Sequence, residues 1–141
     1  MANSDIPDKK IVIVISALLE KGQATNRAAV LATGLAAHVP NMIGGDSTTK
    51  DGQTLLGFTQ IPIPILTTKP DTSLPELTKK GQELGCMVIV FLSRAQGMRS
   101  YEEYRQSIAQ TNSQDLDIDA VALYGDKVSV TKVTGNLPAL R

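Results

Sequence analysis

The stretch Lys10-Ile11-Val12-Ile13-Val14-Ile15 decides the fold class of this chain. Its consecutive β-branched residues favour a strand, and because no polar residue interrupts them, both faces of that strand must be covered. Helices on each side of a sheet give such cover. Outward from this strand, segments typical of strands alternate with segments typical of helices. The order predicts three layers, α/β/α, around a four-stranded mixed, largely parallel sheet.

A helix is expected after the polar segment at 21–26. Thr25 or Asn26 can cap its first turn, and alanines and leucines then recur at helical spacing on one face, at Ala28, Leu31, Ala32 and Leu35. Small alanines on that face allow the helix to pack close to the sheet. Pro40 ends the segment.

The next strand is expected over 61–66, at an edge of the sheet. Pro62 and Pro64 stand two residues apart, so both remove backbone donors from the same side of the strand. That side of the strand cannot form a full set of hydrogen bonds with a neighbouring strand, whereas the opposite side can. The proline pair therefore predicts that this strand lies at an edge of the sheet.

Two capping-box patterns predict the starts of two further helices. Ser73-Leu74-Pro75-Glu76 and Ser100-Tyr101-Glu102-Glu103 both have the Ser-x-x-Glu spacing in which the two side chains satisfy the free N–H groups of a first turn. Strands are expected over 86–92 and 119–124. A last helix from Gly125-Asp126 to Gly135 completes the order, although the β-branched residues in it would also tolerate a strand.

One domain is expected over 9–141, after a polar, proline-containing tail at 1–8 that is predicted to be disordered. An insertion is expected at 41–57, which contains Asp51-Gly52, a pair that suits a tight hairpin turn. The insertion is either a flap above a site or a surface excursion. Its composition favours the surface excursion.

The composition narrows the classes of function. Fourteen basic residues balance 14 acidic ones, so no polyanionic partner such as nucleic acid is indicated, although a local basic patch stays open. The single cysteine, Cys86, sits in an apolar run that predicts an inert core thiol, and a lone thiol fits a reducing compartment. No signal peptide or membrane span is recognised, so a cytoplasmic location is expected.

Six polar residues form the candidate site. Ligands of such sheets bind beyond the carboxyl ends of the strands, which selects the loops after the first and third strands. The arginines of these loops could converge at one rim and form an anion pocket with helix N-terminal donors, or they could be solvated or paired with Glu20, Glu102 and Glu103. The predicted ligand-binding residues are Gln23, Asn26, Arg27, Ser93, Arg94 and Arg99.

Other constellations are weak, and neither a metal nor a cofactor is expected. His38 falls at the end of a helix, where a surface or capping histidine is favoured over a catalytic base. Ser93 lacks the glycine-flanked elbow of a hydrolase nucleophile. Asp115, Asp117 and Asp119 alternate along the approach to a strand, which indicates its exposed face more simply than a metal cluster.

Three segments resemble the type-two peptidyl-tRNA hydrolases. They are the strand Lys10–Ile15 with the later Ala28-Ala29 pair, the junction Leu84-Gly85-Cys86-Met87-Val88, and the ending Lys132-Val133-Thr134-Gly135-Asn136-Leu137. The resemblance implies the fold of that family and a homodimer. Where that family has its reactive lysine and aspartate, this chain has Asn26 and a position near Ser93, and a neutral amide and a hydroxyl cannot form the same cation–carboxylate pair.

The Pro-Ile-Pro strand and the longer segment 100–112 are similar instead to an uncharacterised sister group, domain of unknown function 2000. We therefore expect a module that binds a small anionic or nucleotide-like group, or a regulatory module. One alternative is a hydrolase of altered chemistry that acts on an aminoacyl or peptidyl ester, with Ser93 or a water as nucleophile and Arg27 at the oxyanion. The other is a structural or partner-binding protein.

Overall fold

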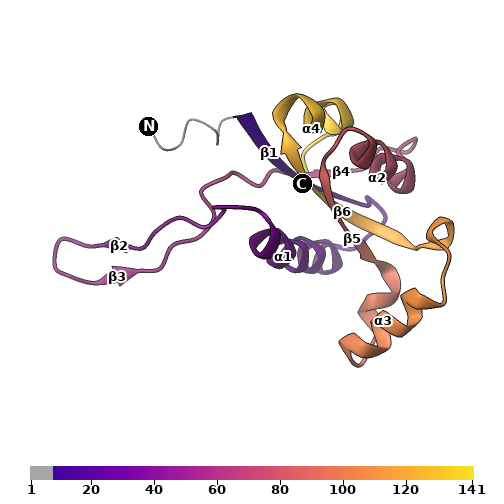
Figure 1. Cartoon of the computed structure of the whole chain (residues 1–141), viewed down its shortest axis with the longest axis horizontal. Coiled ribbons are helices and arrows are strands. Elements are labelled where there is room, and N and C mark those ends of the chain that lie inside the picture. Colours follow the sequence, from indigo (N-terminus) through magenta and orange to yellow (C-terminus); the bar gives the residue numbers. More distant parts are fainter. Residues whose placement is uncertain (1–7) are drawn as a thin grey trace.

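A computed structural model describes residues 8–141, so the predicted disordered tail at 1–8 lies outside the described residues except for Asp8. The elements follow in the order β1 (Lys9–Ile15), α1 (Lys21–His38), β2 (Ser47–Thr48), β3 (Thr54–Leu55), β4 (Ile65–Thr67), α2 (Leu74–Glu83), β5 (Met87–Leu92), the 3-10 turn η2 (Ser93–Gly97), α3 (Tyr101–Ala109), the 3-10 turn η3 (Ser113–Asp115), β6 (Ile118–Asp126) and α4 (Lys127–Thr134) (Figure 1).

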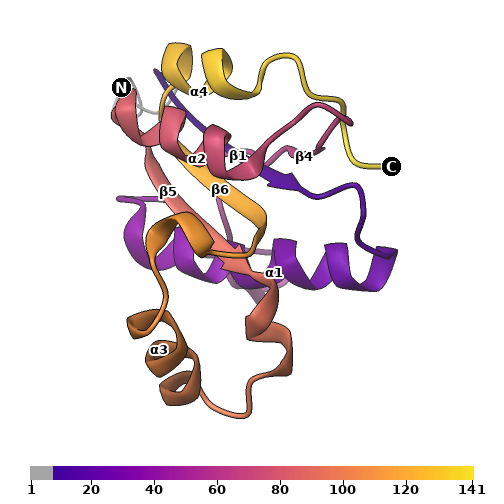
Figure 2. The same cartoon turned by 90° about the vertical axis from the view of Figure 1, so that its right-hand side faces the viewer.

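The main sheet has four strands in the order β4-β1-β6-β5. It is mixed, as predicted, but it is not largely parallel, because only β1 and β4 pair in parallel. β6 runs antiparallel to both of its neighbours. The reason is α3, which would have to cross over the sheet if the strands before and after it were parallel. α3 lies beyond the end of β5 instead, so the chain enters β6 at the same end of the sheet at which it left β5 (Figure 2).

The three predicted layers are present. Ile11, Ile13 and Ile15 of β1 pack in one cluster with α1, and Val12 and Val14 pack in a second cluster with α2 and α4. Residues 11–15 are all almost fully buried. Because side chains point to opposite faces of a strand in turn, β1 packs against helices on both sides of the sheet. Its uninterrupted β-branched run requires this cover on both faces.

Both predicted helix starts are confirmed, each with the serine half of its capping box. Ser73 accepts a hydrogen bond from the Glu76 N–H in α2, and Ser100 accepts one from the Glu103 N–H in α3. The predicted start of α1 at Thr25 or Asn26 is wrong. Glu20 is the N-cap, and its N–H donates to the Gln23 side chain at 3.1 Å, so the polar residues from 21 onward already form the first turns.

The prediction for the proline-containing strand is confirmed in position but not in extent. β4 is an edge strand, yet it covers only Ile65–Thr67, because Pro62 and Pro64 leave the preceding residues without donors for a ladder. Pro64 still contributes its carbonyl, which accepts from the Ile13 N–H at 3.0 Å. The last segment is a helix, α4, rather than a strand. Among residues 8–141, no helix combines the length and apolar character that crossing a membrane requires.

Candidate functional site

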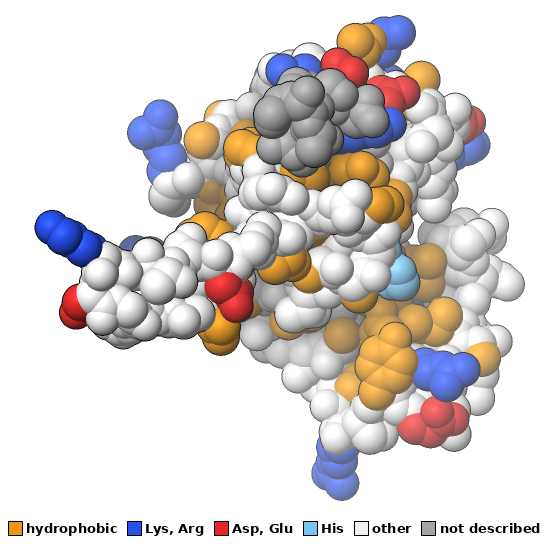
Figure 3. Space-filling view, turned by 60° about the vertical axis from the view of Figure 1, so that its left-hand side comes forward, with side chains coloured by type: hydrophobic (Ala, Val, Ile, Leu, Met, Phe, Trp, Pro, Cys, Tyr) orange, Lys and Arg blue, Asp and Glu red, His pale blue; other side chains and the backbone are white. Residues whose placement is uncertain are grey.

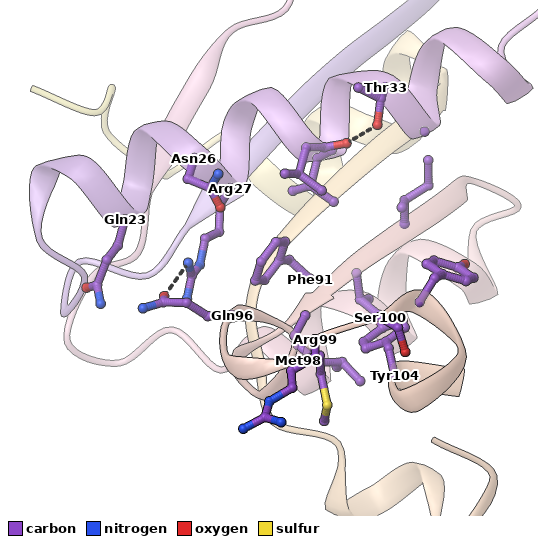
Figure 4. Close-up of a pocket in the computed structure, with 18 of the residues that line it drawn as sticks. Gln23, Asn26, Arg27, Thr33, Phe91, Gln96, Met98, Arg99, Ser100 and Tyr104 are labelled. Carbon is purple, nitrogen blue, oxygen red and sulfur yellow. Dashed lines mark hydrogen bonds between the residues drawn. The ribbon is translucent and has the colours of Figure 1, made fainter. Parts of the chain in front are cut away.

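A cleft of about 760 Å³ opens at the outer edge of β5. Residues 22–34 of α1 form one side, residues 89–92 of β5 form the floor, and residues 95–104 of η2 and α3 form the other side. Figure 4 shows the side chains of these segments directed into the space between them. Most of the lining is apolar and includes Phe91, Tyr101 and Tyr104, while Gln23, Asn26, Gln96 and Arg99 supply polar groups.

Arg27 lies at the wall of the cleft and is almost completely buried, with 2% of its surface exposed. Its Nε donates to Asp119 Oδ1 at 3.2 Å and its Nη2 donates to Asp119 Oδ2 at 2.8 Å. Nη1 donates to Gln96 Oε1 at 2.7 Å, and the guanidinium lies 4.3 Å from the centre of the Phe91 ring. Every face of this cation is therefore occupied by the protein itself.

Asp119 is the residue that the sequence did not reveal. The alternation of Asp115, Asp117 and Asp119 was taken to mark an exposed face, but Asp119 is buried, with 7% exposed. The prediction is wrong because the position lies at the start of the central strand β6, opposite Arg27. Local sequence carries no signal for this pair, because Arg27 lies within α1 and Asp119 lies in β6.

Ser93 lies beside this ion pair, on its solvent-exposed side. Its side chain is exposed, and its hydroxyl donates to Asp119 Oδ2 at 2.9 Å. Ser93 and Arg27 are thus brought together through one carboxylate, as two donors to the same acceptor. Ser93 does not line the cleft.

Arg94 is held away from the cleft by Asp117. Its Nε donates to Asp117 Oδ1 at 2.7 Å and its backbone N–H donates to Asp117 Oδ2 at 2.8 Å. Nη1 reaches Ser107 of α3 at 3.1 Å and Thr111 at 2.7 Å. Because α3 has no fully buried residue of its own, these bonds fasten the helix that forms one side of the cleft.

Burial raises the pKa of Asp117, but the hydrogen bonds from the Arg94 side chain and backbone lower it more, so the pKa lies below its ordinary value of 3.8. A depressed folded-state pKa means that the contact stabilises the protein above the unfolded-state pKa and is lost as the pH falls through the folded-state pKa. We expect hydrogen-exchange protection of α3 to stay constant from pH 7 to about pH 5 and to decrease below about pH 4.

The control for that prediction is Asp117→Asn, which keeps the shape and removes the titration. In this variant, α3 should exchange faster than in the wild type at pH 6, and acid should have little further effect on α3. Equal protection of α3 in both proteins at pH 6 would contradict the assigned role of the contact.

Arg99 differs from the other two arginines. It is exposed, and its backbone N–H donates to Glu103 at 3.2 Å, whereas no hydrogen bond or ion pair within residues 8–141 involves its guanidinium. Of the six predicted site residues, Gln23, Asn26, Arg27 and Arg99 line the cleft, and Ser93 and Arg94 do not. The three guanidinium groups do not form a shared anion pocket, because Asp119 and Asp117 occupy two of them.

The histidine and the cysteine of the chain both lie outside the cleft. His38 is exposed at the last turn of α1, and Cys86 is buried, where burial raises the pKa of its thiol. Within the described part of the chain, the histidine, cysteine and acidic residues form no group of three that could hold a metal ion.

The fold and the cleft define a three-layer α/β protein with a ligand-sized cavity at a sheet edge. The family model described as "Protein of unknown function (DUF2000)" matches residues 9–141, and the chain belongs to this family. The predicted likeness to that group is therefore confirmed. These comparisons give no support to a relation with the peptidyl-tRNA hydrolases.

A solved structure shares the fold. It is that of Atu0240, a protein of unknown function from Agrobacterium tumefaciens strain C58, with a TM-score of 0.84 and 19% identity over 95% of this chain and 98% of that chain. No curated protein matches the chain.

Proposed function

We propose that this protein binds a small organic molecule with a flat apolar body and one negatively charged group. The observation that carries the proposal is the cleft beside β5, which combines a mainly apolar lining with Arg99, whose guanidinium has no partner within residues 8–141. Its volume, about 760 Å³, falls within the range typical of small-molecule sites.

The shape of the ligand is inferred from the aromatic lining. Phe91 lies on the floor beneath Arg27, and the rings of Tyr101 and Tyr104 lie 5.7 Å apart between their centres on the opposite side. Aromatic walls favour planar ligands, since ring faces and edges pack well against one another. An alicyclic or aromatic body suits this space better than a flexible sugar.

The charge of the ligand is inferred from the arginines. Asp119 balances Arg27 and Asp117 balances Arg94, which leaves Arg99 at the cleft. One uncompensated cation suits a monoanion such as a carboxylate. A di- or triphosphate would need several cations or a helix N-terminus aimed at it, so we narrow the expected ligand from a nucleotide-like group to a monoanion.

Replacing Val30 with tryptophan should abolish binding of aromatic monocarboxylates such as naphthoate and indole acetate. Val30 is a half-exposed residue of α1 that lines the cleft, so the larger side chain fills the cavity without disturbing the core. Arg99→Gln should weaken binding of the carboxylates about tenfold, which corresponds to about 1.4 kcal/mol, and should leave binding of the matching amides unchanged. Ligand-observed NMR and calorimetry would measure both effects.

Two matched variants control for surface effects. Val128→Trp places the same side chain on α4, where Val128 is 68% exposed and away from the cleft. Arg105→Gln removes an exposed arginine of α3 that pairs with Glu102 instead of lining the cleft. Binding that is equally sensitive to the control variants, or no binding of any carboxylate or amide in the panel, would rule the proposal out.

A second candidate is the ester hydrolase of altered chemistry. It is favoured by the exposed Ser93 hydroxyl, which already donates to the Asp119 carboxylate. The same carboxylate also accepts two bonds from Arg27, which leaves it little capacity to take a proton from Ser93. Turnover of an aminoacyl and peptidyl ester panel tests this function, and activity that disappears in Ser93→Ala would favour it over simple binding.

A further inference from the structure

Residues 41–60 form an arm that projects away from the body of the protein (Figure 1). The arm is a two-stranded ribbon with β2 and β3 near its tip, and antiparallel bonds continue to its base, where Gly44 N–H donates to Phe58 O and Gln60 N–H donates to Met42 O, each at 2.8 Å. A turn at Asp51-Gly52, with Gly52 at a φ of 97°, closes the tip. The insertion is therefore a hairpin, as its Asp-Gly pair indicated, and it does not fold back over the cleft of its own chain.

The arm exposes large apolar side chains that no other part of residues 8–141 covers. Leu56 and Phe58 are each 80% exposed and Leu55 is 51% exposed. A two-stranded ribbon is marginally stable in water by itself, since it has no second layer in which to bury such side chains. A contiguous apolar surface on a projecting segment is typical of a segment that docks on another molecule.

A second uncovered apolar feature is the outer edge of β5. This strand ends the sheet, and its sequence Met-Val-Ile-Val-Phe-Leu contains neither the charged residue nor the proline that usually protects an edge. Residues 87–90 are only partly buried. Backbone groups alternate in direction along a strand, and Ile13 donates its N–H to β4. When this alternation is followed through the residue pairs of β1 with β6 and of β6 with β5, the N–H and C=O groups of Val88 and Val90 point away from β6, toward the open side.

We propose that the arm of a second copy of this chain docks along the β5 edge, with Leu56 and Phe58 against the apolar part of the cleft between α1 and α3, so that the arm and the small ligand proposed above occupy different parts of this cleft. The arm supplies an extended backbone and apolar side chains, and the edge supplies unpaired backbone groups and an apolar floor, which is the pattern of strand addition. In a two-fold dimer, the arm of each chain docks on the β5 edge of the other. Both arms and both β5 edges are then covered.

A second copy suits this site better than an unrelated partner because donor and acceptor occur on the same chain. Figure 3 shows the arm and an apolar hollow beside the single histidine, which is pale blue, on one face of the molecule. With 14 basic and 14 acidic residues, two copies carry no net charge that would oppose association. The fold match to Atu0240 covers 95% of this chain, so most of the arm belongs to the shared fold.

The first test is the mass in solution, measured by sedimentation velocity without any small-molecule ligand, so the result does not depend on the proposed ligand-binding function. The wild type should be a dimer at 10 µM. Leu56→Ser combined with Phe58→Ser should shift the dissociation constant at least 100-fold and give a monomer. The matched control combines Leu18→Ser and Val128→Ser, which removes two apolar side chains, 94% and 68% exposed, outside the arm and the cleft, and it should remain a dimer.

The second test places the arm in the cleft. Phe58→Cys and Tyr101→Cys chains are prepared separately and mixed under mild oxidation, while the native Cys86 stays buried. A disulfide-linked dimer should form quickly only in the mixture. A monomeric wild type at 1 mM, a dimer that survives the arm substitutions, or cross-linking no faster in the mixture than in either protein alone would each overturn the proposal.

Discussion

Replacing Asp119 with asparagine is expected to lower the free energy of unfolding by about 3–5 kcal/mol, because it leaves a buried arginine without its counter-charge. The Arg27 and Asp119 side chains are only 3% and 10% exposed, so water cannot replace the lost carboxylate. Urea unfolding followed by far-UV circular dichroism measures the change. The spectrum suits this chain, which has no tryptophan to report by fluorescence.

The exposed ion pair between Lys9 and Asp126 provides the control. Its side chains are 39% and 69% exposed, so solvent screens the pair and Asp126→Asn should leave the free energy of unfolding almost unchanged. The double variant Arg27→Met, Asp119→Leu should recover much of the stability lost in Asp119→Asn, since it removes both buried charges together. A loss below about 1 kcal/mol for Asp119→Asn would contradict the role assigned to the pair.

Replacing Leu123 with alanine is expected to cost about 2–5 kcal/mol of unfolding free energy. Leu123 is fully buried in β6, and a Cβ added to Gly81 of α2 would lie only 2.7 Å from its Cδ2 atom. The absence of a side chain at Gly81 thus lets α2 pack directly on the leucine. Truncation of Leu123 leaves a cavity under the helix, whereas Leu18→Ala, at a residue 94% exposed, should have almost no effect.

The same contact predicts a sign change in a double-mutant cycle. In the wild type, Gly81→Ala should not stabilise the protein, because the helix propensity that alanine gains, about 1 kcal/mol, is opposed by the collision with Leu123. In the Leu123→Ala background, the collision with Leu123 is gone and only Val88 Cγ2, at 3.3 Å, has to shift slightly for the new methyl group, so Gly81→Ala should be stabilising. Identical effects of Gly81→Ala in both backgrounds would show that the two residues do not limit each other's size.

The sequence predicted best where a local pattern leaves one physical choice. The β-branched run at 11–15 had to lie inside two helix layers, and it does. The serines of the two Ser-x-x-Glu spacings cap α2 and α3 because an N-cap bond involves only four neighbouring residues. α1 starts earlier than predicted because Glu20 and Gln23 form a full capping box from a less common pair of residues.

The sheet direction could not be obtained in the same way. An alternating order of strands and helices resembles a parallel sheet, but α3 joins β5 to β6 without crossing the sheet, and β6 enters between β1 and β5 in the opposite direction. Whether a helix crosses a sheet depends on what it packs against. α3 has a polar sequence and no fully buried residue, so it lacks the apolar face that would hold it against the sheet.

The residue types of this chain determined its layers, the starts of α2 and α3, its proline-limited edge and the loops from which part of its site is built, because each follows from interactions between close neighbours in sequence. Only the tertiary structure decided what the arginines do. Arg27 and Asp119 are separated by 92 positions along the chain, and a long flexible side chain takes whichever partner the folded backbone brings within reach. That choice converted a predicted anion pocket into a neutral, buried ion pair beside an apolar cleft.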